Sequence, residues 1–253
     1  MRMVLLTALG IGGSTIVGAI IGLFIKKITT KVNDIILGFA AGVMLAAAVT
    51  GLILPAVETG GKFGVLIAVA GIFCGALFLN VLDRFVPHLH RVAGCDIESH
   101  CQKNDELNKI LLFVLAIAMH NLPEGMAAGV SFGSGDMGSV LTVAGGIALQ
   151  NIPEGIVVMT PMVASGVKRG RYFLIAAATG LVEVVGTIIG YFTVSITSAI
   201  LPFLLAFAGG TMIYVISDEM IPETHANGNE RAATYALLAG FCVILIMNQY
   251  IGG

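Results

Sequence analysis

The chain has 253 residues, of which 57% are hydrophobic and only 11% are charged. Because soluble globular domains carry about 25% charged residues, this composition excludes an ordinary soluble domain and predicts an integral membrane protein. The net charge of −2, without a basic stripe, gives no support for a nucleic-acid partner.

The apolar residues gather in runs that are long enough to cross a bilayer as helices, which requires about 20 residues each. The runs are too long and too rich in glycine for barrel strands, and a helix satisfies its own backbone hydrogen bonds in lipid. The predicted fold is therefore an all-α integral membrane protein. We predict eight transmembrane helices at residues 3–25, 35–55, 65–82, 110–130, 140–163, 172–194, 200–216 and 232–251.

Loop charges predict the orientation of these helices, because positive residues gather on the cytoplasmic side. With the N-terminus outside, eleven of the 13 Lys and Arg residues fall in inner segments, and only Arg2 and Lys62 lie outside. Both termini are then extracytoplasmic, and the polar loop at 83–109 is cytoplasmic. Since this loop is too short for a separate domain, residues 1–253 are predicted to form a single transmembrane domain in the cell (inner or plasma) membrane.

Two similar motifs lie inside the fourth and fifth predicted helices, AMHNLPEG at residues 118–125 and LQNIPEG at residues 149–155. His120 and Glu124 are four residues apart and share one helix face, and Gln150 and Glu154 repeat this spacing. A charge at the bilayer centre costs about 2.5–3.5 kcal/mol. Glu124, Glu154 and Glu183 are nevertheless placed within the spans, where no Lys or Arg lies at the same depth. Either a mobile cation or a proton is therefore expected to neutralise them.

Two prolines extend the polar surface of these helices. Pro123 and Pro153 lack a backbone N–H, so the carbonyls of Met119 and Leu149 lose their helical partners. We expect a kink in each helix and exposed polar backbone at the depth of the carboxylates. Imidazole, carboxylate and amide groups then converge between two antiparallel helices, and this set favours zinc, iron, nickel or copper over magnesium or calcium.

With these motifs the chain resembles the ZIP (Zrt-, Irt-like) divalent metal transporters, and Gln150 in the second motif is similar to their GufA branch. The resemblance covers nearly the whole chain. It rests on the two P-E-G motifs, on Met44 in GFAAGVMLAAA, on Glu183 in GLVEVVG, on DRFVPHLH from Asp83 and on SDEMIPETH from Ser217. It implies eight helices, both termini outside, and a transport site formed mainly by the fourth and fifth helices.

The resemblance also implies a binuclear metal site. One metal would be held by Met44, His120, Glu124, Gln150 and Glu154. The neighbouring metal would be held by Asn121, Glu124, Asn151, Glu154 and Glu183, with Glu124 and Glu154 as bridges. Some relatives have histidine in place of Gln150 and aspartate in place of Asn151. Because a neutral amide is a weaker ligand, the second position is expected to bind metal less tightly or to have a regulatory role. A packed core methionine is the alternative for Met44.

Several peripheral polar residues fit a path for the ion. Glu58 is placed at the outer end of the second helix, as an entrance. The cytoplasmic ends of the third and seventh helices carry Asp83, His88, Asp218 and Glu219, as an exit. Each of these residues has an alternative as part of a solvated helix end. The segment CDIESHC, with Cys95, Asp96, Glu98, His100 and Cys101, is either a zinc-binding loop or merely a polar one.

The sequence therefore predicts a carrier that imports a divalent metal, foremost Zn²⁺, with Cd²⁺, Fe²⁺ and Mn²⁺ as further candidates. No resident cofactor and no enzymatic activity are expected, and no ATP-binding motif is present. Protonation of Glu124 or Glu154 is a hypothesis for metal release, because two close carboxylates do not both stay charged cheaply once the metal leaves. The resemblance implies alternating access, in which the helices that carry the site slide past the others.

Three alternatives stay open at this point. An intramembrane metalloprotease would need an H-E-x-x-H motif, which the sequence lacks. A metal sensor without flux would use the same ligands, and export would use the same topology. Two G-x-x-x-G pairs, Gly18 with Gly22 and Gly38 with Gly42, predict close helix packing within one bundle, with a homodimer as the alternative.

Overall fold

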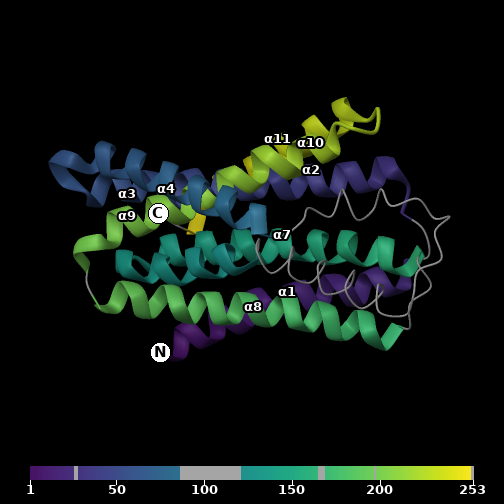
Figure 1. Cartoon of the computed structure of the whole chain (residues 1–253), viewed down its shortest axis with the longest axis horizontal. Coiled ribbons are helices and arrows are strands. Elements are labelled where there is room, and N and C mark those ends of the chain that lie inside the picture. Colours follow the sequence, from purple (N-terminus) through teal and green to yellow (C-terminus); the bar gives the residue numbers. More distant parts are fainter. Residues whose placement is uncertain (26–27, 86–120, 165–168, 197, 252–253) are drawn as a thin grey trace.

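The computed structural model describes residues 1–25, 28–85, 121–164, 169–196 and 198–251. Within these residues the chain is helical and contains no strand, which confirms the all-α fold (Figure 1). The elements are α1 (Arg2–Phe24), α2 (Thr30–Ala47), η1 (Ala48–Ile53), α3 (Leu54–Thr59), η2 (Gly61–Phe63), α4 (Gly64–Phe85), a helix at 121–131, η3 (Phe132–Ser134), α7 (Met137–Ala164), α8 (Arg169–Ile196), η4 (Ser198–Ile200), α9 (Leu201–Val215), η5 (Ile216–Met220), α10 (Ile221–Thr224) and α11 (Glu230–Ile251).

Seven segments of the described chain are long and apolar enough to cross a membrane. They coincide with seven of the eight predicted spans. The remaining predicted span, at 110–130, is described only from residue 121 onward, where it is helical. The structure therefore confirms a multi-pass membrane protein, and the total of eight spans stays a prediction.

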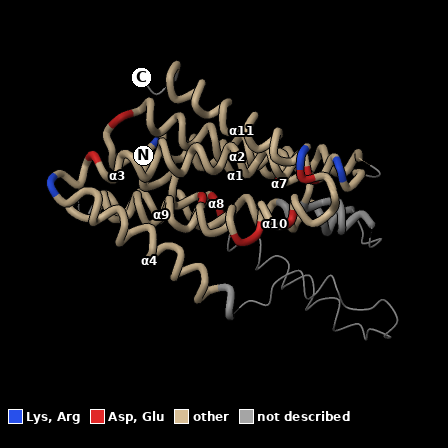
Figure 2. Tube along the Cα trace, turned by 90° about the horizontal axis from the view of Figure 1, so that it is seen from above, with Lys and Arg blue, Asp and Glu red and all other residues tan. Residues whose placement is uncertain are grey.

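The two termini lie at the same end of the bundle (Figure 1). This arrangement agrees with the even number of crossings that the sequence predicts. Most charged residues of the described chain lie at the two ends of the bundle, and a few acidic residues lie in its middle (Figure 2). Which end faces the cytoplasm stays a prediction based on the loop charges.

The helices pack in two groups. In the first, α1 packs against α7 and α8, and the helix at 121–131 lies against α8; we name these four helices the α1 group. In the second, α2 packs against α11, and α4 packs against α9; we name these four helices the α2 group. Contacts between α2 and α7 join the two groups.

Glycines fix the helices within each group. A Cβ atom at Gly18 would collide with the backbone of Ile152 in α7, and one at Gly42 would collide with the backbone of Leu237 in α11. At Gly51 and Gly146, which face the other group, a Cβ atom would meet side chains first. The predicted packing role of the G-x-x-x-G glycines is thus confirmed at Gly18 and Gly42, and the homodimer stays untested. At Gly18 and Gly42 the helices of one group thus touch backbone to backbone, whereas at Gly51 and Gly146 the contacts between the groups are with side chains.

Two helices widen near prolines that the motif analysis did not single out. The α2 helix continues into the π-helical turn η1, where the N–H of Leu54 donates to the carbonyl of Val49 five residues earlier, directly before Pro55. The π-helical turn η5 stands in the same relation to Pro222 after α9. Such turns accommodate a residue without an N–H and often lie near functional sites. In contrast, α7 remains α-helical through Pro153, so the predicted kink there brings no change of helix type.

Candidate metal-transport site

Five polar side chains form a buried cluster inside the α1 group. Asn121 and Glu124 come from the helix at 121–131, Gln150 and Asn151 from α7, and Glu183 from α8. None of these residues is more than 2% exposed. Buried polar groups without compensation are costly, so the partners of each group decide what this cluster does.

The carboxylate of Glu183 accepts three hydrogen bonds from three other helices. Asn121 donates its side-chain N–H to Oε1 of Glu183. Asn151 donates to Oε2 over 2.6 Å. The hydroxyl of Thr15 in α1 donates to Oε1 over 2.7 Å. Glu183 is therefore the point at which all four helices of the α1 group meet.

Glu124 has a different pattern of partners. Gln150 donates its side-chain N–H to Oε1 of Glu124 over 2.8 Å. The second carboxylate oxygen, Oε2, has no hydrogen-bond partner among the described residues. The same is true of the side-chain oxygens of Asn121, Gln150 and Asn151. Four buried acceptor oxygens are thus left without a donor inside the described part of the chain.

This set of oxygens suits a positively charged guest. Each amide already uses its N–H group to donate to a carboxylate, so its oxygen is left to accept a proton donor or to coordinate a cation. A cation at this cluster would compensate the negative charge of the buried carboxylates of Glu124 and Glu183. Among the described residues, however, no three His, Cys, Asp or Glu side chains come close enough to hold a metal by themselves. A metal site here would need the amide oxygens or His120.

The glycines of the two P-E-G motifs have a packing role that the motif reading missed. A Cβ atom at Gly125 would collide with the backbone of Glu183, and one at Gly155 would collide with the backbone of Thr15. The two motif helices can therefore approach α8 and α1 closely at these points. The close approach at Gly125 brings Asn121 within hydrogen-bond distance of Glu183, and the one at Gly155 places Thr15 of α1 against α7.

The other predicted ligands lie in varied surroundings. Glu154 in α7 is half-buried. Met44 in α2 is buried in the same apolar cluster as Ile11 of α1 and Ile147 of α7. This environment agrees with the alternative that Met44 is a packed core methionine. His120, the partner of Glu124 in the first motif, lies outside the described residues.

The peripheral candidates are only partly described. Glu58 is exposed in the last turn of α3. Asp218 is exposed and Glu219 is half-buried, and both lie in the π-helical turn η5. Asp83 lies near the end of α4, but its side chain is not described. His88 and the CDIESHC segment lie outside the described residues, so these predictions stay untested.

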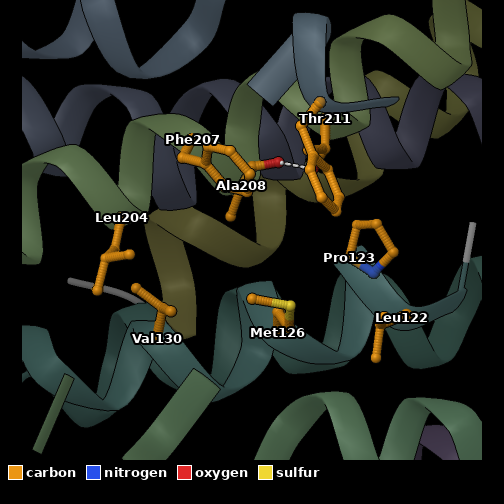
Figure 3. A pocket seen from close by; sticks show the side chains of 9 residues that line it. Leu122, Pro123, Met126, Val130, Leu204, Phe207, Ala208 and Thr211 are labelled. Carbon is orange, nitrogen blue, oxygen red and sulfur yellow. Dashed lines mark hydrogen bonds between the residues drawn. The ribbon is translucent and has the colours of Figure 1, made fainter. Parts of the chain in front are cut away.

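The opposite face of the helix at 121–131 is apolar. It borders a cavity of about 160 Å³ between this helix, α4 and α9 (Figure 3). The only hydroxyl in the lining, that of Thr211, donates to the carbonyl of Ala208 over 2.7 Å and is thus satisfied. The lining comprises Phe78, Leu122, Pro123, Met126, Val130, Leu204, Phe207, Ala208 and Thr211. The helix therefore presents polar residues to the α1 group and apolar residues to the α2 group.

Comparison with known proteins places this architecture in a family. The family model described as "ZIP Zinc transporter" matches residues 100–248. The chain is 41% identical over 254 residues to "Zinc transporter GufA" of Myxococcus xanthus, with 98% of each chain covered. It is 39% identical to "Zinc transporter ZIPB" of Bordetella bronchiseptica, covering 94% of this chain and 78% of that protein. It is 29% identical to "Zinc transporter ZIP11" of Homo sapiens, covering 95% and 94%.

These three relatives each match more than nine tenths of this chain, and the residues matched by the family model span both P-E-G motifs and Glu183. Identities of 41% and 39% to the two bacterial relatives, over almost the full length of this chain, are high enough to establish common family membership. The helical bundle and its buried cluster of carboxylates and amides agree with that assignment. The chain therefore belongs to the ZIP zinc transporter family.

Proposed function

We propose that this protein carries divalent transition-metal ions, foremost Zn²⁺, across the membrane into the cytoplasm through the buried polar cluster. The observation that carries the proposal is the set of four buried acceptor oxygens, one of them Oε2 of Glu124, that have no donor among the described residues and lie beside the carboxylate of Glu183. A buried site rich in acceptors and poor in donors favours a cation over an anion or a neutral solute. The zinc transporters among its relatives support the same substrate.

The ligand sets named above remain our proposal for the two metal positions. In the first, Glu124 and Gln150 would offer the unpaired oxygens Oε2 and Oε1, joined by Met44, His120 and Glu154. In the second, Glu183 already accepts three hydrogen bonds, so a metal would have to displace at least one of these donors. This competition supports weaker binding at the second position. The carrier would need no resident cofactor.

Alternating access would follow from the two helix groups. Because backbone contacts at glycines join the helices within each group, each group would move as one body. Side chains alone would have to exchange partners at the boundary between the groups, where the apolar cavity lies. Asp218 and Glu219 would receive the ion at the cytoplasmic end, and Glu58 would attract it outside. Protonation of Glu124 or Glu154 would assist release.

Two measurements on the same purified protein test this function. Zinc uptake into proteoliposomes that contain a zinc-sensitive dye should be saturable, and isothermal titration calorimetry in detergent should detect zinc binding. If the protein is a zinc carrier, we expect both saturable uptake and zinc binding. Binding without uptake would reject transport and favour the metal sensor, whereas neither binding nor uptake would reject a metal site altogether.

Filling the apolar cavity should slow transport without weakening zinc binding. In the variant Ala208→Leu, the added carbons would occupy much of the 160 Å³ between α9 and the helix at 121–131 and would obstruct their relative movement. We expect the uptake rate to fall by roughly fivefold, with the zinc Kd within about twofold of the original value. The matched control is Ala70→Leu, which makes the same change at an exposed position of α4. Equal rates in both variants would argue against sliding at this boundary.

A further inference from the structure

Thr15 of α1 lies outside both P-E-G motifs but forms a hydrogen bond with the buried polar cluster. Its side chain is 4% exposed, and its hydroxyl donates to Oε1 of Glu183 over 2.7 Å. A threonine hydroxyl in a transmembrane helix most simply donates to a carbonyl of its own helix. Thr187 does this on α8, where its hydroxyl donates to the backbone carbonyl of Glu183 over 2.9 Å. Thr15 instead donates to a carboxylate on a different helix, 168 residues away in the sequence.

The carboxylate of Glu183, which Thr15 holds by this hydrogen bond, in turn accepts hydrogen bonds from two amide side chains. Its Oε1 accepts from both Thr15 and Asn121, and its Oε2 accepts from Asn151. Because a carboxamide group is planar, fixing its N–H group also fixes the direction of its oxygen. The oxygens of Asn121 and Asn151 are two of the four acceptors that lack a donor in the described chain. Their direction therefore depends on where the carboxylate of Glu183 is held.

Thr15 is held in place by the backbone of its own helix. A Cβ atom at Gly155 would collide with the carbonyl oxygen of Thr15, so α7 and α1 touch at this residue. Three residues earlier in α1, Gly12 is similarly close to the backbone of Gly180 in α8. These two close contacts place α1 directly against α7 and α8 within one helical turn of Thr15. The donor to Glu183 is thus as rigid as the helix packing itself.

We propose that Thr15 is a positioning residue of the metal site, which acts through Glu183 to aim the oxygens of Asn121 and Asn151. This inference rests on the proposed function, because it treats the cluster as the place where the metal binds. A rigidly aimed pair of oxygens discriminates between ions of different size, whereas a loosely held pair adapts to both. Loss of the Thr15 hydroxyl is therefore expected to change the ratio of the affinities for Zn²⁺ and the larger Cd²⁺.

The test compares three substitutions that change hydroxyl groups near Glu183. Thr15→Val removes the donor and keeps the shape of the side chain, and Thr15→Ser restores the donor. Thr187→Val is the matched control, since it removes a hydroxyl that is also buried but donates to the backbone carbonyl of Glu183 and not to its carboxylate. The readouts are the Kd values for Zn²⁺ and Cd²⁺ from titration calorimetry, together with thermal unfolding in detergent.

We expect Thr15→Val to weaken zinc binding by about tenfold and cadmium binding by less, because loss of a group that orients a metal ligand costs about 10–100-fold in affinity. Thr15→Ser should lie within about twofold of the original protein, as should Thr187→Val. An unchanged ratio of the two Kd values in Thr15→Val would overturn the inference. An equal loss in Thr187→Val would also overturn it, since both residues would then act through packing alone.

Two further variants keep the result unambiguous. Thr15→Ala removes the same hydroxyl and replaces Thr15→Val if the valine variant does not fold. Glu124→Ala separates this inference from the proposed function, since it removes a charge from the cluster itself. If Glu124→Ala loses zinc binding while the Thr15 variants keep the original Kd values, only the inference about Thr15 fails. If Glu124→Ala binds and transports zinc normally, the proposed function fails.

Discussion

Replacement of Glu124 by alanine is expected to reduce zinc uptake into proteoliposomes by at least about 100-fold. Glu124 is 2% exposed, and its Oε2 is one of the four buried oxygens that have no donor in the described part of the chain. In the proposed site it bridges both metal positions, so its loss would remove one ligand from each and half of the carboxylate pair that balances the ion's charge. The measurement is initial uptake against zinc concentration, with zinc affinity measured in parallel by calorimetry.

Glu124→Gln serves as the matched control for this prediction. It keeps the shape of the side chain and an oxygen that can accept from Nε2 of Gln150, but it removes the charge. We expect an uptake intermediate between the alanine variant and the original protein, because an amide oxygen is a weaker metal ligand than a carboxylate. Full activity of the alanine variant would contradict the placement of the metal at this cluster.

Much of this site follows from the sequence because helical spacing is regular. A separation of four residues places His120 with Glu124, and Gln150 with Glu154, on one face of each helix. The structure brings Glu124 and Gln150 together by a hydrogen bond of 2.8 Å. The contact of Thr15 with Glu183 could not be predicted in this way, since it joins α1 to α8 across 168 residues. Nothing in the local pattern around Thr15 distinguishes it from the many small polar residues that pack transmembrane helices.

The ends of a helix could be predicted only where hydrophobicity alone sets them, and the start of α2 is an exception. The sequence predicts the second span from residue 35, but α2 begins at Thr30, because Thr29 caps it by accepting the backbone N–H of Val32 over 3.3 Å. The first turns of α2 contain Asp34, which is fully buried and accepts hydrogen bonds from Asn227 and Asn229. A hydropathy pattern assigns a charged residue such as Asp34 to a loop. It contains no information on hydrogen-bond partners that lie almost 200 residues away in the sequence.

Substitution of Gly12 by alanine is expected to destabilise the protein by about 1–3 kcal/mol, the usual cost of overpacking. A Cβ atom at Gly12 would collide first with the backbone of Gly180 in α8, which cannot move aside as the end of a flexible side chain could. The helices α1 and α8 would have to separate, which would also draw Thr15 away from Glu183. Thermal unfolding in detergent, followed by circular dichroism, measures the loss of stability, and the zinc Kd should weaken with it.

Gly13 provides a control one position further along the same helix. A Cβ atom at Gly13 would meet no atom of another described element within 4 Å. Because alanine favours helix over glycine by about 0.5–1 kcal/mol, Gly13→Ala should be neutral or stabilising and should leave zinc binding unchanged. The same chemical change at adjacent residues is thus expected to have opposite signs, since only Gly12 faces α8. Equal effects of the two substitutions would show that the close approach of α1 and α8 does not determine stability, and the rigid placement of Thr15 would lose its physical basis.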